Sequence, residues 1–172
     1  MQTLEAKAKQ LLAEARARTS QSNPLLKAIR DNPAAIFTLA GRTPDAWQKN
    51  LLCSRSSRLL LMATRQGGKS AIAAALALNT ALLKPGSLTL LVSRAQRQSG
   101  ELFQDKVLRL FNSLGRPLAT KQESALTMRL SNNSRIVSLP GDEETIRCYS
   151  GVDLLIIDEA ARVPDALYFA VR

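Results

Sequence analysis

The sequence predicts an α/β fold in which a mainly parallel sheet is flanked by helices. Three apolar runs of strand length carry this prediction, namely Arg58–Ala63, Leu88–Val92 and Val152–Ile157. Helical patterns lie between them, and buried strands that alternate with helices form parallel sheets covered by those helices. Ligands of such sheets bind beyond the carboxyl ends of the strands, so chemistry is expected just after these runs.

Composition narrows the class of protein. The chain has 172 residues, of which 45% are hydrophobic and 22% charged, as in a globular domain. It has no histidine, which excludes Ser-His-Asp and Cys-His catalysis and His-ligated metals within the chain. Its two cysteines, Cys53 and Cys148, lack the paired spacing of a disulfide framework or a zinc site. The net charge of +10 favours a polyanionic partner, with nucleic acid first.

Targeting signals are absent from the sequence. The apolar runs are too short to cross a membrane, and the N-terminus has no secretory signal, so we expect a cytoplasmic protein without a membrane partner. Residues Leu4–Arg18 have helical spacing, and Thr19–Pro24 reads as a linker. We therefore divide the chain into an N-terminal helical arm and linker, 1–24, and a main domain, 25–172. The arm either contacts a partner protein or DNA, or packs on its own domain.

Local signals place the remaining helices. A short helix is expected over Asp45–Leu52, and an Ala- and Leu-rich helix over Lys69–Leu83 is stopped by Lys84-Pro85-Gly86. Ser93 to Gln96 fits a capping box that opens a third helix. The apolar face of that helix carries Phe103, Val107, Leu110, Phe111 and Leu114, and Gly115 closes it.

A hairpin is expected before the third apolar run. Leu126, Met128 and Leu130 alternate with polar neighbours, and the turn-rich stretch 131–134 follows. The apolar stretch 136–139 then supplies the second strand of the hairpin.

The segment before the Lys69–Leu83 helix has the form of a phosphate loop. Gly67 and Gly68 let main-chain amides approach a phosphate, Lys69 can reach the β and γ phosphates, and Ser70 can ligate Mg²⁺. The pattern G-x-x-x-x-G-K-[ST] begins with glycine, whereas Ala63 holds that position here. We predict a P-loop NTPase that binds ATP with Mg²⁺. The loop residues predicted to bind the nucleotide are Thr64, Arg65, Gln66, Gly67, Gly68, Lys69 and Ser70.

Two acids follow the third apolar run. Charges at the end of a buried strand are costly unless they face a metal or solvent. Asp158 is suited to the Mg²⁺ shell, together with Ser70, and Glu159 to the catalytic base that orients the attacking water. The alternative is a strand that simply ends in solvated acids.

Four side chains suit further roles around the nucleotide. Arg65 could stabilise charge on the transferred phosphoryl group or pair with a neighbouring subunit, and Arg147 is a second arginine of this kind. Gln48 presents a donor and an acceptor, which match the edge of adenine. Trp47 could stack near the base, although a single tryptophan is also a common core anchor.

Together these stretches resemble the ATPase domain of the large terminase subunit of tailed bacteriophages. The resemblance is carried by Pro44–Gln48, Arg65–Ser70 with its non-Gly start, and Leu154–Ala161, and it runs from about Asn32 onward. It implies a RecA/ASCE-like fold and a motor that hydrolyses ATP to drive double-stranded DNA into a procapsid. It assigns Gln48 to adenine, Lys69 and Ser70 to phosphate and magnesium, Asp158 to the metal, Glu159 to the base and Arg65 to the loop arginine.

The resemblance also implies partners and a longer chain. Family members work as a ring on the portal protein with a small terminase subunit, in the cytoplasm of the bacterial host. They continue with a strand bearing a coupling motif and then a nuclease domain, so we expect this chain to be truncated at its C-terminus. Cys148 stands where a small residue is expected. The alternatives are a helicase or translocase of another P-loop family, or a non-catalytic fragment that binds nucleotide or DNA.

Overall fold

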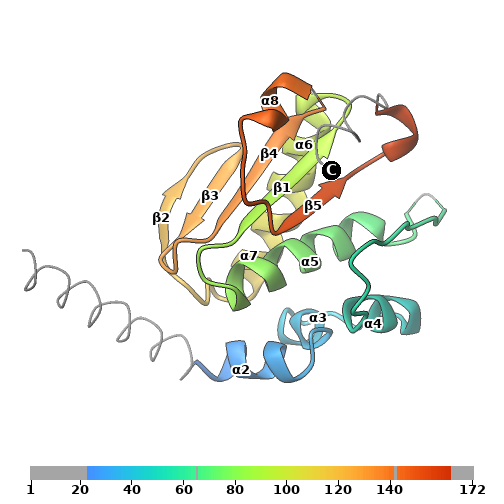
Figure 1. The fold of residues 1–172 in the computed structure, drawn as a ribbon. Coiled ribbons are helices and arrows are strands. Elements are labelled where there is room, and N and C mark those ends of the chain that lie inside the picture. The colour runs from blue at the N-terminus through green and yellow to red at the C-terminus, as the bar shows by residue number, and fades with distance from the viewer. Residues whose placement is uncertain (1–22, 65, 142, 164–172) are drawn as a thin grey trace, which may run out of the picture.

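The computed structural model describes residues 23–64, 66–141 and 143–163, and they fold around one five-stranded sheet (Figure 1). The predicted arm helix, Leu4–Arg18, lies outside these residues. The strands are β1 (Leu88–Ser93), β2 (Thr120–Glu123), β3 (Thr127–Leu130), β4 (Arg135–Pro140) and β5 (Leu154–Ile157). The helices are α2 (Pro24–Asp31), α3 (Ala35–Leu39), α4 (Ala46–Leu52), α5 (Lys69–Leu83), α6 (Gln96–Leu102), the π-helical η1 (Phe103–Leu108), α7 (Arg109–Ser113), α8 (Glu143–Arg147) and the 3₁₀ turn η2 (Ala160–Arg162).

The sheet has the order β2-β3-β4-β1-β5. Its parallel part is β4-β1-β5, and all six residues of β1 are buried because β1 lies between two parallel neighbours. The hairpin strands β2 and β3 add an antiparallel margin to β4. The predicted α/β class and the predicted hairpin are therefore confirmed. Within the described residues, no helix is long and apolar enough to span a bilayer.

The main core lies between the sheet and the α5–α7 side. Helix α5 begins and ends where the sequence predicted, and its Ile72 and Leu78 are almost fully buried. The continuous segment α6-η1-α7 buries the predicted face, including Phe103 and Phe111, which have no exposed surface. A second cluster on the opposite side of the sheet joins Leu90 and other β1, β4 and β5 residues to α8.

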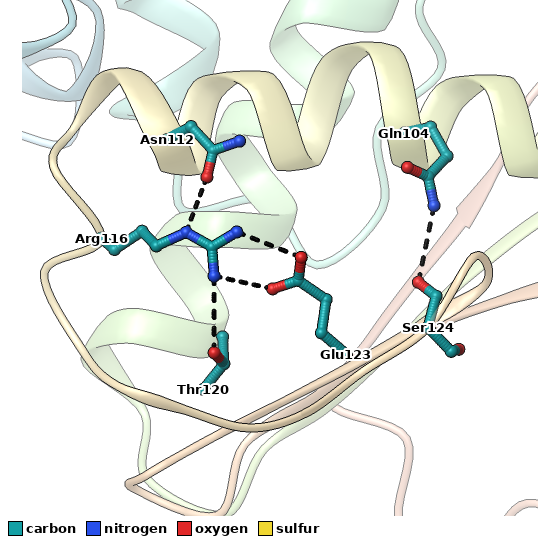
Figure 2. Close-up of polar contacts among 6 residues, drawn as sticks. All are labelled: Gln104, Asn112, Arg116, Thr120, Glu123 and Ser124. Atoms are coloured by element: carbon teal, nitrogen blue, oxygen red, sulfur yellow. Dashed lines mark hydrogen bonds and ion pairs between the residues drawn. The ribbon is translucent and has the colours of Figure 1, made fainter.

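The hairpin β2-β3 is fastened to the helical segment by polar contacts, which Figure 2 shows. Arg116 donates to both carboxylate oxygens of Glu123, at 2.9 and 3.1 Å, and to Asn112 Oδ1 at 2.8 Å. Gln104 donates to the main-chain carbonyl of Ala125 at 2.7 Å. These contacts orient the margin of the sheet relative to η1 and α7.

The prediction of a strand over Arg58–Ala63 is wrong, because these residues pair with none of the described strands. The segment forms neither a helix nor a paired strand, and Leu60 and Met62 are 86% and 87% exposed. Only Leu61 packs against the main core. Apolar composition gives a segment the tendency to be a strand, but a strand also needs a hydrogen-bonded neighbour, and no described strand supplies one here. The predicted buried run at β5 is half-buried for a related reason, because β5 stands at the edge of the described sheet.

The predicted capping box from Ser93 to Gln96 is also wrong. Ser93 is the last residue of β1, two residues before the N-cap of α6. Its hydroxyl donates to the carbonyl of Ala95 at 2.8 Å, and α6 begins at Gln96 with Ala95 as its N-cap. A capping box does form at α4, where Asp45 caps the helix and Gln48 reaches back.

Candidate nucleotide-binding site

The predicted phosphate loop turns sharply into α5. Gln66 and Gly68 both have left-handed backbones, with φ of 61° and 85°, and the N–H of Gly67 donates to the carbonyl of Thr64 at 3.2 Å. Glycine adopts such a φ at little cost, which explains Gly68 at the N-cap of α5. The first amides of this 15-residue helix lack partners within the helix and favour an anion at this end.

Lys69 folds back over the loop. Its ammonium donates to the carbonyls of Ala63, at 2.5 Å, and Thr64, at 3.2 Å. The helix start and this cation thus concentrate positive charge on one short stretch of chain.

The side chain of Gln48 lies against the loop. It is 8% exposed, and its Oε1 accepts from the N–H of Asp45 at 2.9 Å. A Cβ placed on Gly68 would lie only 2.5 Å from Gln48 Nε2 and 3.7 Å from Trp47 Cζ2. Trp47 also packs against the main core, so it is at once a core residue and a neighbour of the loop. The fold therefore brings α4 to the phosphate loop, as the prediction for Trp47 and Gln48 requires.

The two acids follow β5. The N–H of Asp158 donates to Val92 at 2.8 Å and extends the pairing with β1 by one residue. Glu159 then has a left-handed backbone, with φ of 50°, and its N–H donates to Asp158 Oδ1 at 3.0 Å. The carboxylate of Glu159 accepts from Gln98 Nε2 at 3.4 Å and lies 4.0 Å from Arg162. Sequence reasoning did not find Gln98, because nothing in the local pattern distinguishes it from other polar residues of α6.

The start of α5 and the end of β5 lie toward the same end of the sheet (Figure 1). Helix α5 also packs on β5, so the loop and the acids belong to neighbouring elements. Arg65 lies outside the described residues, and Arg147 is the last residue of α8, which packs on β4. Cys148 is exposed.

Asp153, which precedes β5, is joined to β1 by a hydrogen bond and to the end of α5 by an ion pair. Asp153 accepts from the N–H of Leu88 at 2.8 Å and contacts the ammonium of Lys84. The Lys84 hydrogen bond, followed by the Leu88 bond, lowers the pKa of Asp153 below that of an ordinary aspartate. The pair therefore fixes the start of β5, the strand that Asp158 and Glu159 follow.

The donor chemistry fits a Mg²⁺ that is bound with a nucleotide. Ser70 and Asp158 offer oxygen ligands, which magnesium prefers. Within residues 23–64, 66–141 and 143–163, no three Asp, Glu or Cys side chains gather into a metal site of their own. Magnesium in phosphate sites takes one or two protein oxygens and fills its shell with phosphate and water, so this sparse set is compatible with it.

Solved structures of a phage large terminase ATPase domain share this fold. The chain is similar to the Thermus phage P74-26 large terminase ATPase domain, with a TM-score of 0.67 and 22% identity. The match covers 77% of this chain and 60% of that domain. An arginine-to-alanine mutant of that domain matches with a TM-score of 0.63 and 23% identity, over 78% of this chain and 63% of that one. The resemblance to the terminase ATPase domain is thus confirmed as a shared fold, and the chain spans about 60% of the solved domain's length.

A family model adds a second finding. None of the curated proteins matches the chain. The family described as "RNA cytidine acetyltransferase NAT10/TcmA, helicase domain" matches residues 60–170, which is more than half of the chain. Both comparisons point to a P-loop ATPase-like fold. The chain therefore belongs to the NAT10/TcmA helicase-domain family.

Proposed function

We propose that the chain binds ATP with magnesium and hydrolyses it to drive movement along nucleic acid, with double-stranded DNA as the track and packaging into a viral procapsid as the outcome. The fold shared with a phage large terminase ATPase domain over 77% of the chain supports this proposal. The matching motifs at Gln48, in the phosphate loop and at Asp158-Glu159 support it as well.

The observation that carries the proposal is the meeting of α4 with the phosphate loop. Gln48 is almost fully buried against Gly68, and the ammonium of Lys69 lies over the same turn. A buried amide beside a helix start is what recognition of a base and its phosphates requires, because the amide offers both a donor and an acceptor.

The residues would divide the work as follows. Loop amides and Lys69 hold the phosphates, while Ser70 and Asp158 hold magnesium. Bound magnesium supplies positive charge that offsets charge on the transferred phosphoryl group. Glu159 accepts a proton from the water that attacks the γ-phosphorus, and ADP leaves.

Two variants test these roles separately. Glu159→Gln should keep ATP affinity and lower turnover about 10²–10⁴-fold, the usual contribution of a general base. Lys69→Ala should weaken binding itself. Binding is measured with a fluorescent ATP analogue and turnover by phosphate release, with Glu101→Gln and Lys106→Ala as controls of matched charge. Equal loss of binding and turnover in Glu159→Gln would contradict its role as base.

A second function is favoured by the family match. An RNA-directed helicase-type ATPase would also use the loop and the acidic pair, and residues 60–170 match the NAT10/TcmA helicase domain. The two functions differ in the nucleic acid that stimulates hydrolysis. Stimulation by duplex DNA favours the packaging motor, and stimulation by single-stranded RNA favours the helicase. Phosphate release no higher than that of Lys69→Ala, with nucleotide binding intact, would indicate a non-catalytic binder.

The proposed assembly is a ring on the portal protein with a small terminase subunit, as the resemblance implies. In such a ring Arg65 would stabilise transition-state charge in its own loop or in a neighbour's site. Mixing Arg65→Ala with Glu159→Gln distinguishes these options, because only action across subunits allows the mixture to recover turnover. Sedimentation with ATP and magnesium measures whether the ring forms.

A further inference from the structure

The outer face of the β2–β4 margin carries cations that repel one another. Arg129 and Arg135 stand directly opposite each other in the antiparallel β3–β4 register, and Gln122 is aligned with Arg129 on β2. Directly opposed residues project from the same face of a sheet, with Cα atoms about 5 Å apart. Both arginines are exposed. Like charges in this arrangement destabilise a hairpin, so the pair does not stabilise the fold.

These arginines project away from the main core. Side chains alternate along a strand, and their neighbours Met128, Leu130 and Ile136 belong to the core shared with α5, η1 and α7. Arg129 on β3 and Arg135 on β4 therefore lie on the opposite face, next to the margin of the sheet that β2 and β3 form. A third exposed cation, Lys121 of β2, lies close to the turn between β3 and β4, where its ammonium donates to Asn133 Oδ1 at 2.6 Å.

No carboxylate neutralises the pair within the described residues. The acid of β2, Glu123, is aligned with buried Met128 on the helix side and is held by Arg116 (Figure 2). Other exposed arginines do have acidic partners, such as Arg97 with Glu101 and Arg109 with Asp105. Arg129 and Arg135 thus differ from these arginines in lying side by side without an acid.

We infer that this face, built around Arg129 and Arg135 with Lys121 close to the β3–β4 turn, binds the phosphate backbone of a nucleic acid. Two exposed guanidinium groups on directly opposed residues can each donate to a phosphate oxygen, and Gln122, which is aligned with Arg129, is polar as well. The chain's net charge of +10 adds long-range attraction for the same polyanion. The inference rests on the proposed function and names the surface that would bind the nucleic acid along which the ATPase moves.

The face lies at the other end of the sheet from the phosphate loop. Arg135 is aligned with Leu88 at the start of β1, whereas Asp158 bonds to Val92 near the end of β1. Substitutions on the face should therefore leave nucleotide binding intact, and the two sites can be tested independently.

The test compares two double variants of equal net charge. Arg129→Gln/Arg135→Gln removes the unpaired cations, and Arg97→Gln/Arg109→Gln removes the same charge from ion-paired helix positions. Binding of a labelled DNA duplex is followed by fluorescence anisotropy without nucleotide, between about 50 and 200 mM salt. A single-stranded RNA with the same number of phosphates forms the second arm. Melting curves of both variants establish that each is folded.

The first variant should flatten the slope of log K against log salt by roughly 1.8 on duplex DNA, since each lost phosphate contact removes about 0.9. On single-stranded RNA the change should be roughly 1.4. Because this difference between the arms follows from charge density alone, the nucleic acid is identified as the one that the unaltered chain binds more tightly at equal salt. The helix variant should change the slope much less. Equal changes of slope in both variants, or no change in the first variant, would overturn the inference. It would also be overturned if labelled poly-glutamate bound more tightly than the nucleic acids and lost its binding in the first variant. Because no ATP is present, failure here is distinct from failure of the ATPase proposal.

Discussion

The contact between Gly68 and Gln48 can be measured as a stability difference. The substitution Gly68→Ala places a Cβ at a left-handed φ of 85°, 2.5 Å from Gln48 Nε2. The left-handed backbone costs about 1–2 kcal/mol for alanine. Gln48 must also move, which breaks its 2.9 Å hydrogen bond to Asp45 and the capping box of α4. Loss of such a cap costs about 1 kcal/mol.

We therefore expect Gly68→Ala to lower the free energy of unfolding by about 2–3 kcal/mol. For a chain of this size the melting temperature should fall by about 5–10 °C. The matched control is Gly86→Ala, because Gly86 has a similar φ of 76° and nothing within 4 Å of its added Cβ. That control should cost only the backbone part, about 1–2 kcal/mol.

A double-mutant cycle isolates the contact itself. In a Gln48→Ala background the added Cβ meets only Trp47 Cζ2, at an ordinary 3.7 Å, so the excess cost of Gly68→Ala should disappear. Chemical denaturation of the four proteins gives the coupling energy. If Gly68→Ala and Gly86→Ala cost the same, or if the excess persists without Gln48, then α4 does not approach the loop as described.

Three further outcomes are expected. Because Lys84 lowers the pKa of Asp153, the stability from this pair is present above the ordinary aspartate pKa of about 3.9 and is lost as pH falls through the lowered value. The Asp153→Asn variant should therefore have a lower free energy of unfolding at pH 7 and lose less of it on acidification. Identical profiles of unfolding free energy against pH for the variant and the parent chain would contradict the pair. Replacing exposed Leu60 and Met62 by Gln should change stability by less than about 0.5 kcal/mol and reduce aggregation, as scored by melting and light scattering. Ile72→Ala should instead cost about 2–5 kcal/mol, because Ile72 is 1% exposed, and a small effect on melting would place α5 outside the core.

The shared fold also explains why two functions are proposed for this chain. The ATPase domain of a phage terminase has this fold, and the family model belongs to a helicase domain. Both functions proposed for this chain would use its predicted phosphate loop and the acids that follow β5. The difference between them therefore lies in the nucleic acid that is bound rather than in the phosphate chemistry.

Local sequence determined the elements whose signals are short-range. The apolar period and the Lys84-Pro85-Gly86 stop gave the bounds of α5, and turn residues between alternating stretches gave the β3–β4 hairpin. The Gly67-Gly68 turn before the helical pattern predicted the tight turn into α5, because glycine conformations and helix ends depend mainly on neighbouring residues.

Tertiary structure decided what depends on distant partners. The run Arg58–Ala63 has the composition of a strand but no described strand to pair with, and pairing cannot be read from a single segment. Ser93 completes β1 and pairs with Pro140, while α6 begins only after Ala95, so the cap lies two residues later than the local pattern predicted. The contacts of Gln98 with Glu159 and of Gln48 with Gly68 likewise join residues far apart in sequence. Local patterns set backbone preferences, whereas only the packed chain determines which of them find partners.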